Sequence, residues 1–314
     1  MIANDSTMNA RIDNNTPTHM LPPGNMNSGH WHGRLALDFS MRNGATRLVR
    51  KEHFGPLYVQ KPFYPEGRDL AHVYLLHPPG GLVSGDRLEI SVELDQSARV
   101  QMTTPGAGKV YRARQAGAVQ EQVNLLRVGA GSMLEWFPQE CIVFDSADAR
   151  LSTEVHLEPS STFSGWELVS LGLPASKQAF TRGSIGQKLE ILESGRPVLV
   201  ETLRIDQDDA AFLQSGVGLQ GCPVTGLFIA GPFRNPGSTP ELLKQLRELS
   251  DEYKPIDSVR SRCHTAVTLV NDFILCRYLG TCSWQARQFF MAAWSRTRPV
   301  LNSRPVCAPR IWST

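Results

Sequence analysis

The sequence predicts a mainly β protein with a few helices, one of them near the C-terminus. Apolar and polar residues alternate along Arg99–Thr103 and Val119–Leu125, with the period of two that half-buried strands show. The same pattern continues through 132–144, and glycine-rich or proline-rich turns separate the segments. Strand is therefore expected to follow strand over residues 34–205.

Two strand pairs are expected from their turns. Residues 189–192 and 198–205 flank five turn residues that include Gly195, which suits a hairpin. Residues 265–270 and 273–278 form a second pair, joined by an Asn-Asp turn. No internal repeat of fixed period is visible, so the residues alone do not predict a regular solenoid.

Two helices are expected towards the C-terminus. Ser238 and Glu241 form a capping box, and an apolar stripe follows it over 242–249. A second helix is predicted from Ser283 to about Thr297, with Pro299 ending it.

Composition limits the class of protein. The chain has 314 residues, of which 41% are hydrophobic and 20% charged, enough for a sizeable core. With 32 basic and 30 acidic residues, it lacks the excess charge of a nucleic-acid binder. It also lacks an apolar run of about 20 residues, so no membrane span is expected. Residues 1–29 carry neither a signal-peptide pattern nor periodicity, so we expect a disordered extension, one β-rich domain over 30–314 and a cytoplasmic protein.

The six cysteines do not form a metal-binding spacing. No C-x-x-C pair occurs, and several cysteines lie beside apolar residues, which favours reduced and mostly buried thiols. A zinc site remains the alternative, without the close ligand spacing that usually marks one.

Common catalytic motifs are missing. The segment Gly106–Lys109 resembles the end of a P-loop, but Thr103 stands where the motif needs glycine and Val110 where it needs serine or threonine. Neither G-x-S-x-G nor H-E-x-x-H occurs. A catalytic triad assembled from distant residues stays possible, because such groups need not be adjacent in sequence.

The most informative stretches are His77–Asp86 and Thr104–Arg112, both dense in glycine and proline next to charged residues. With Phe63–Pro65, Leu134–Glu140 and Trp166–Glu167 in this order, the chain resembles the UreD family of urease accessory proteins, also called UreH. The resemblance implies a β-helical fold of stacked sheets with a few helices, and a protein that is not an enzyme.

The resemblance also implies partners. UreD-like chains bind apo-urease and the helical protein UreF, which in turn holds the GTPase UreG. In that family picture UreG releases nickel on GTP hydrolysis, and the UreD-like chain gives the ion a protected route towards urease. Nickel is then in transit, and no cofactor is expected to stay bound.

A route of this kind constrains the residues that line it. A full set of thiolate or imidazole ligands would trap nickel, whereas scattered carboxylates give weak affinity and fast exchange. Buried carboxylates without partners are costly and suggest a cavity or a cation. The candidate lining residues within the family-like motifs are Asp86, Glu135, Glu140, Asp145 and Glu167.

Each candidate has a structural alternative. Asp86 follows a glycine-rich turn and suits an Asx-turn. Glu135 suits the solvent-facing side of its strand, and Glu140 suits a charge at a strand edge. Asp145 and Glu167 also fit purely structural roles. His77 is expected to orient the turn that follows it rather than to bind nickel.

Aromatic residues on the last predicted helix exceed what one apolar face needs. We expect part of the set to contact UreF, because aromatic residues concentrate in the centres of interfaces. The set is Trp284, Phe289, Phe290 and Trp294.

Three rival functions stay open at this point. They are a docking scaffold through which no ion passes, a β-helical hydrolase and a generic binding module.

Overall fold

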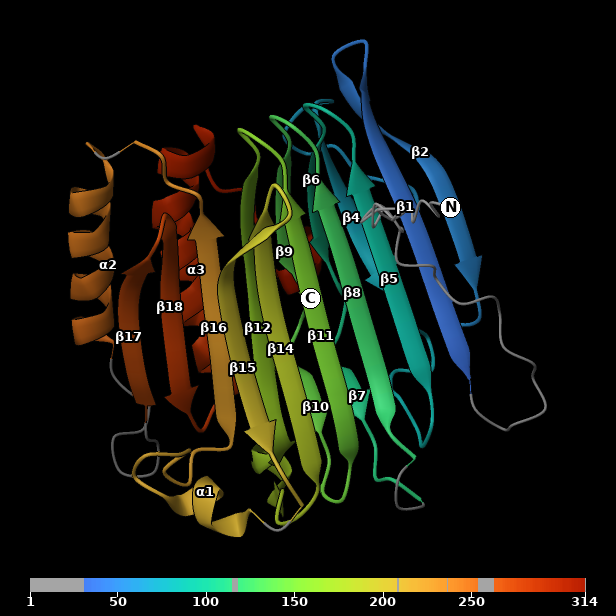
Figure 1. Ribbon diagram of the computed structural model, residues 1–314, viewed down its shortest axis with the longest axis vertical. Helices are drawn as coiled ribbons and strands as arrows, with labels where there is room; N and C mark the ends of the chain where they lie inside the picture. Colours follow the sequence, from blue (N-terminus) through green and yellow to red (C-terminus); the bar gives the residue numbers. More distant parts are fainter. Residues whose placement is uncertain (1–30, 115–117, 208, 236, 254–262, 314) are drawn as a thin grey trace, which may run out of the picture.

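The computed structural model describes residues 31–114, 118–207, 209–235, 237–253 and 263–313. They form two stacked β-sheets, with two long helices on the outer face of one sheet (Figure 1). The predicted extension over 1–29 lies outside the described residues.

The smaller sheet has seven strands in the order β15-β14-β11-β8-β5-β1-β2, and Figure 1 shows it in front. Its strands are β1 (His32–Arg42), β2 (Ala45–Phe54), β5 (Arg87–Leu94), β8 (Gln120–Val128), β11 (Asp148–Leu157), β14 (Ser184–Glu193) and β15 (Arg196–Ile205). The five inner strands run parallel to one another. The edge strands β2 and β15 pair antiparallel to their neighbours as hairpins.

The larger sheet has eleven strands, eight of which lie in the order β17-β18-β16-β12-β9-β6-β4-β3. Short strands β7 and β10 extend it beside β12, and β13 also pairs with β12. Its strands are β3 (Tyr58–Val59), β4 (Leu70–Leu76), β6 (Arg99–Thr103), β7 (Gly108–Val110), β9 (Met133–Phe137), β10 (Cys141–Val143), β12 (Thr162–Leu173), β13 (Gln178–Ala179), β16 (Val224–Gly231), β17 (Cys263–Val270) and β18 (Phe273–Gly280).

The chain winds between the two sheets. From β4 to β14, the long strands alternate between the larger and the smaller sheet, and each pairs in parallel with the strand of the previous coil. This winding confirms the β-helical arrangement of stacked sheets. Successive strands of the smaller sheet begin at Arg87, Gln120, Asp148 and Ser184, and this uneven spacing explains why no fixed repeat is visible in the sequence.

Two apolar cores follow from the two layers. One lies between the sheets, and the other lies between the larger sheet and the helices. Strand β9 contributes to both, because successive side chains of a strand point to opposite faces. Leu134 and Trp136 pack between the sheets, and Phe137 packs towards the helices.

The helices are α1 (Ala210–Gln214), α2 (Thr239–Glu252) and α3 (Ser283–Asn302), with the 3₁₀ turns η2 (Pro174–Ser176) and η3 (Arg310–Ser313). Helix α2 packs against β17, and α3 packs against β12, β16 and β18. None of the helices in the described part of the chain is long and apolar enough to cross a membrane.

Three local predictions were wrong. Helix α3 continues through Pro299 to Asn302, because a proline near a helix end removes one N–H group without forbidding the helical φ. Ser238 does precede α2, but its side chain makes no capping hydrogen bond, so the capping box is not formed. The β14–β15 hairpin has two turn residues instead of five, because Ser194 and Gly195 both take the positive φ that a tight hairpin turn needs.

Candidate functional site

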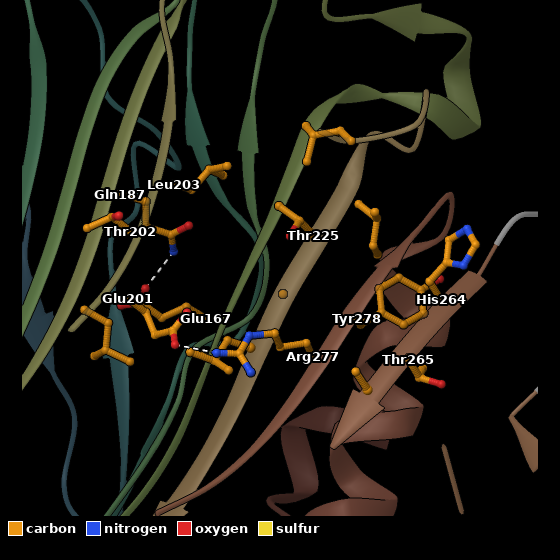
Figure 2. A pocket seen from close by; sticks show the side chains of 16 residues that line it. Glu167, Gln187, Glu201, Thr202, Leu203, Thr225, His264, Thr265, Arg277 and Tyr278 are labelled. Atoms are coloured by element: carbon orange, nitrogen blue, oxygen red, sulfur yellow. Dashed lines mark hydrogen bonds and ion pairs between the residues drawn. The ribbon is translucent and has the colours of Figure 1, made fainter. Parts of the chain in front are cut away.

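Two cavities between the sheets meet at Glu167 on β12 and Gln187 on β14. The first, of about 310 Å³, lies among β14, β15 and β16–β18. The second, of about 410 Å³, extends towards the loops that follow β4 and β6. Glu167 and Gln187 line both, and Gln187 Nε2 donates a hydrogen bond of 2.7 Å to Glu167 Oε2 (Figure 2).

A row of polar side chains crosses the apolar interior at this junction. Gln122 donates to Asn124 at 3.2 Å, and Asn124 donates to Thr153 at 2.9 Å. Thr153 in turn hydrogen-bonds Glu167. All four side chains line the second cavity, so a hydrophilic path runs through a region otherwise filled by aliphatic residues.

The carboxyl group of Glu167 is the unusual titratable group of this row. Burial disfavours its charged form and raises its pKa to about 7, although hydrogen bonds from Thr153 and Gln187 act in the opposite direction. Near neutral pH the group therefore exchanges between a carboxylic acid and a carboxylate.

The first cavity contains a second acidic group. Glu201 on β15 forms an ion pair with Arg277 on β18, which bridges the two sheets across the cavity (Figure 2). His264 and Tyr278 come from β17 and β18 on the far side of the same cavity. A cation entering here meets one carboxylate already balanced by a guanidinium.

The two glycine-rich motifs of the sequence form one mouth of the second cavity. Leu82 N donates to Lys109 O at 2.8 Å, and Tyr111 N donates to Leu82 O at 3.0 Å, so the motifs pair like short parallel strands. Gly81 permits this approach, because a Cβ there would lie 2.5 Å from the Tyr111 ring and 2.8 Å from Lys109 O. His77 lines the same cavity, and burial lowers its pKa, so its imidazole is neutral near pH 7.

One soft ligand also lines the second cavity. Burial, together with the negative charges of Glu167 and Glu140, raises the pKa of Cys141 to about 12. The thiol therefore stays protonated, and a thiol is a far weaker metal ligand than a thiolate. Cys141 is consistent with a site that does not hold soft metal ions tightly.

Comparison with known proteins places the chain in a family. A family model described as UreD urease accessory protein matches residues 32–313. A urease accessory protein UreD of Marinomonas sp. (strain MWYL1) is 43% identical over 302 residues, covering 95% of this chain and 94% of the relative. One of Methylobacillus flagellatus is 38% identical over 285 residues (90% and 95%), and one of Dechloromonas aromatica is 36% identical over 307 residues (98% and 100%). The chain belongs to the UreD family of urease accessory proteins.

Glu167 is the member of the predicted lining set that lines both cavities of this UreD-family chain. Asp86 instead accepts the backbone N–H groups of Trp31 at 3.1 Å and Val83 at 2.9 Å. These are structural contacts, but they are not those of the Asx-turn alternative, because Val83 precedes Asp86 by three residues. Glu140 accepts a hydrogen bond of 3.1 Å from the Ser283 hydroxyl, beside the start of α3.

Glu135 lies in neither cavity. The alternative that placed it on a solvent-facing side of its strand was wrong, because its side chain is 0% exposed. It accepts hydrogen bonds from Gln101, Trp294 and Arg298 at 2.8, 2.9 and 2.9 Å. The apolar residues beside it in sequence face one core, and Glu135 faces the helices on the other side.

Asp145 lies in a separate surface hollow beside Arg112. Partial burial would raise its pKa, but hydrogen bonds from Thr181, Arg182 N–H and Ser146 outweigh that effect and lower it to about 2. Its carboxylate anchors the loop before β14, and it is brought close to neither Glu135 nor the cavity junction.

The aromatic set of α3 divides between core and surface. Trp294, Phe289 and Phe290 are fully buried, so these three form the core part of the set and do not reach a partner surface. The ring of Trp294 packs edge-on against Phe137, inside the core beneath the helix. Trp284 is 51% exposed and keeps its place as a candidate surface residue.

The sequence reasoning missed several groups at the junction. They are Asn124, Thr153, Gln187, Glu201 and Arg277. A usable signal was present, because polar residues interrupt inward-facing aliphatic runs: Gln187 lies between Ile185 and Leu189, and both neighbours are buried in the core between the sheets. A polar side chain in phase with core residues indicates a hydrated interior.

Proposed function

We propose that this chain is a non-enzymatic urease maturation factor that carries nickel through its interior. In this role it links UreF, and through it the GTPase UreG, to apo-urease. The ion would be in transit, so no metal stays bound at the end of the process. Membership of a family of urease accessory proteins supports a role in urease maturation.

The observation that carries the proposal is the junction of the two cavities at Glu167 and Gln187. Both cavities are lined by this pair, so a path from one cavity to the other would pass beside it. The two residues lie on opposing sheets and one hydrogen bond joins them, so in this proposal a cation that moves between the cavities would replace that contact.

The ligands along this path favour transit over storage. Glu167 offers one carboxylate that ionises near neutral pH, and Asn124 and Thr153 offer neutral oxygens. Cys141 is protonated, and Glu201 is already paired with Arg277. A path of single, weak oxygen ligands gives fast exchange, whereas clustered thiolate and imidazole ligands would retain nickel.

The first cavity also holds two carboxyl groups, one with a raised pKa, which is the kind of pair the hydrolase alternative requires. The relatives are described as urease accessory proteins, which favours a role in urease maturation over hydrolysis for this chain. The docking-scaffold alternative makes the cavities irrelevant to urease activation.

Glu167→Gln tests the proposal, because glutamine keeps the shape of the side chain and removes its charge. The exposed Glu158→Gln is the matched control. The variants are expressed with UreF, UreG and urease, the complexes are isolated, and the nickel bound per urease is measured. We expect Glu167→Gln to lower nickel content several-fold with the complex intact and Glu158→Gln to leave it unchanged. Full nickel content with Glu167→Gln would favour the docking scaffold.

A further inference from the structure

Three side chains with metal-binding atoms meet on the other side of the larger sheet from the proposed path. They are Glu66 in the loop before β4, His72 on β4 and Cys307 in the segment after α3. Their ligand atoms all lie within 4.8 Å of one another, and Glu66 Oε1 and His72 Nε2 are 2.8 Å apart. Because Val73 and Leu75 of β4 pack between the sheets, His72 faces the opposite side.

The surroundings of this cluster are buried and carry several charged groups. The side chains of Glu66 and His72 are 8% and 2% exposed, and those of Glu135 and Arg298 are 0% exposed. Arg298 forms ion pairs with both glutamates, so two carboxylates share one guanidinium. Two carboxylates that share one guanidinium can accept further positive charge from a bound cation.

We propose that Glu66, His72 and Cys307 bind one divalent transition-metal ion of the zinc type. A thiolate, an imidazole and a carboxylate are ligands that Zn²⁺ takes together, whereas Mg²⁺ and Ca²⁺ prefer oxygen ligands alone. Water completes the fourth position. With Cys307 as a thiolate, the two charges of the ion offset the negative charges of Cys307 and Glu66.

The three ligand atoms need to move only a short distance to bind one ion. Ligand atoms around a tetrahedral zinc ion lie about 3.5 Å apart, from bonds of roughly 2.0–2.3 Å. The separations of the three ligand atoms, which are at most 4.8 Å, differ from that value by up to about 1.3 Å. On binding, the ion takes the place of the hydrogen bond between Glu66 and His72. Burial and the charge of Glu66 raise the pKa of the Cys307 thiol, so the thiol loses its proton to solvent only as its sulfur bonds to the ion.

Arg298 holds the carboxylate in position for this role. Its Nη1 donates to Glu66 Oε2 and its Nη2 donates to Glu66 Oε1, both at 2.8 Å. The hydrogen bond to Oε2 can persist while Oε1 turns to the ion. Outer groups of this kind orient metal ligands and tune their affinity.

The ion would fasten the segment after α3 to the larger sheet. Arg298 also donates to Pro305 O, and Arg304 pairs with Asp69 next to β4. Trp312, further along the same segment, donates to Thr103 at 2.9 Å and packs beside Trp166. A metal at Cys307 therefore adds a strong link in the middle of a segment otherwise held by individual polar contacts.

Cobalt(II) is the probe, because a Co²⁺–thiolate bond gives a charge-transfer absorption that oxygen ligands do not give. The purified full-length chain is titrated with Co²⁺, and Zn²⁺ is then added as competitor. We expect one equivalent of thiolate-bound cobalt, displaced by Zn²⁺. Cys307→Ser should abolish the band or weaken binding at least about tenfold, whereas Cys282→Ser should keep it.

Zn²⁺ should also raise the melting temperature of the wild type and of Cys282→Ser, but not of Cys307→Ser. A wild-type chain without the thiolate band would overturn the proposal. So would a band that survives Cys307→Ser. Cobalt bound only at oxygen ligands of the path between the sheets gives no such band, so this result does not depend on nickel transit.

Discussion

Glu135 and Glu167 lie on opposite faces of the larger sheet, although the strands that carry them are direct neighbours. Strand β9 pairs in parallel with β12, and Glu135 is in register with Ser164. Glu135 faces α3 and pairs with Arg298, whereas Glu167 faces the other sheet and hydrogen-bonds Gln187. One carboxylate therefore serves packing, and the other lines the cavities.

Removing Glu135 should destabilise the fold. Glu135→Ala leaves Arg298 buried with a single remaining carboxylate partner and deprives Trp294 of its acceptor. We expect the free energy of unfolding to fall by about 3–5 kcal/mol, as for other broken buried ion pairs. Denaturant unfolding measures it, and the exposed Glu158→Ala should change stability by less than about 0.5 kcal/mol. A wild-type midpoint for Glu135→Ala would contradict this assignment.

Glu167 should make stability depend on pH. Its pKa is about 7 in the folded chain against an ordinary value of 4.5, so the folded state retains a proton that the unfolded state loses between these values. The contribution of Glu167 to stability is thus fully present below about pH 4.5 and is lost as the pH rises through 7. Relative to wild type, Glu167→Gln should gain on the order of 2 kcal/mol between about pH 5 and 8. A constant difference in unfolding free energy would refute the raised pKa.

Gly81 and Gly106 offer a matched pair in the two glycine-rich motifs. Alanine at 81 would place its Cβ against Tyr111 and Lys109 O, whereas alanine at 106 meets nothing within 4 Å. We expect Gly81→Ala to cost about 1–3 kcal/mol and Gly106→Ala to be nearly neutral. Thermal unfolding of both variants checks this, and equal melting temperatures would show that the motifs do not need their close approach.

Replacing Trp294 by alanine should lower stability, whereas replacing Trp284 by alanine should weaken binding to UreF. Trp294→Ala removes a fully buried ring and should cost about 3–5 kcal/mol of stability. Trp284→Ala removes a half-exposed ring, so stability should hardly change, while binding to UreF should weaken at least about fivefold. Calorimetric titration with UreF measures the second effect. Unchanged affinity would leave Trp284 an ordinary surface residue.

Local patterns predicted the strands well, because alternation and turn residues are properties of short segments. The strand pairs at 189–205 and 265–278 are present as the hairpins β14–β15 and β17–β18. The face on which a polar residue points was harder to predict. Glu135 has apolar neighbours, and its partner Arg298 is 163 residues away, so nothing near it in sequence indicates burial in an ion pair.

The candidate path was predicted only in part. Glu167 was among the proposed lining residues, but the cavity that it lines is formed by strands from distant parts of the chain. Gln187 and Thr153 were detectable as polar interruptions of inward-facing apolar runs. The position of Glu201 opposite Arg277 depends on how β15 and β18 face each other across the sheets, which no single segment specifies.

The alternation of strands between two layers also bears on how the chain folds. Each inner strand pairs with a strand that is one full coil away along the chain, so these parallel pairs cannot form as local hairpins. Closing such long loops lowers the entropy of the chain before the stabilising contacts between the strands have formed. Folding of this topology is therefore expected to be slow. Newly made chains would therefore spend a long time with unpaired strand edges, and cells making urease would benefit from protecting them until the last coil has closed.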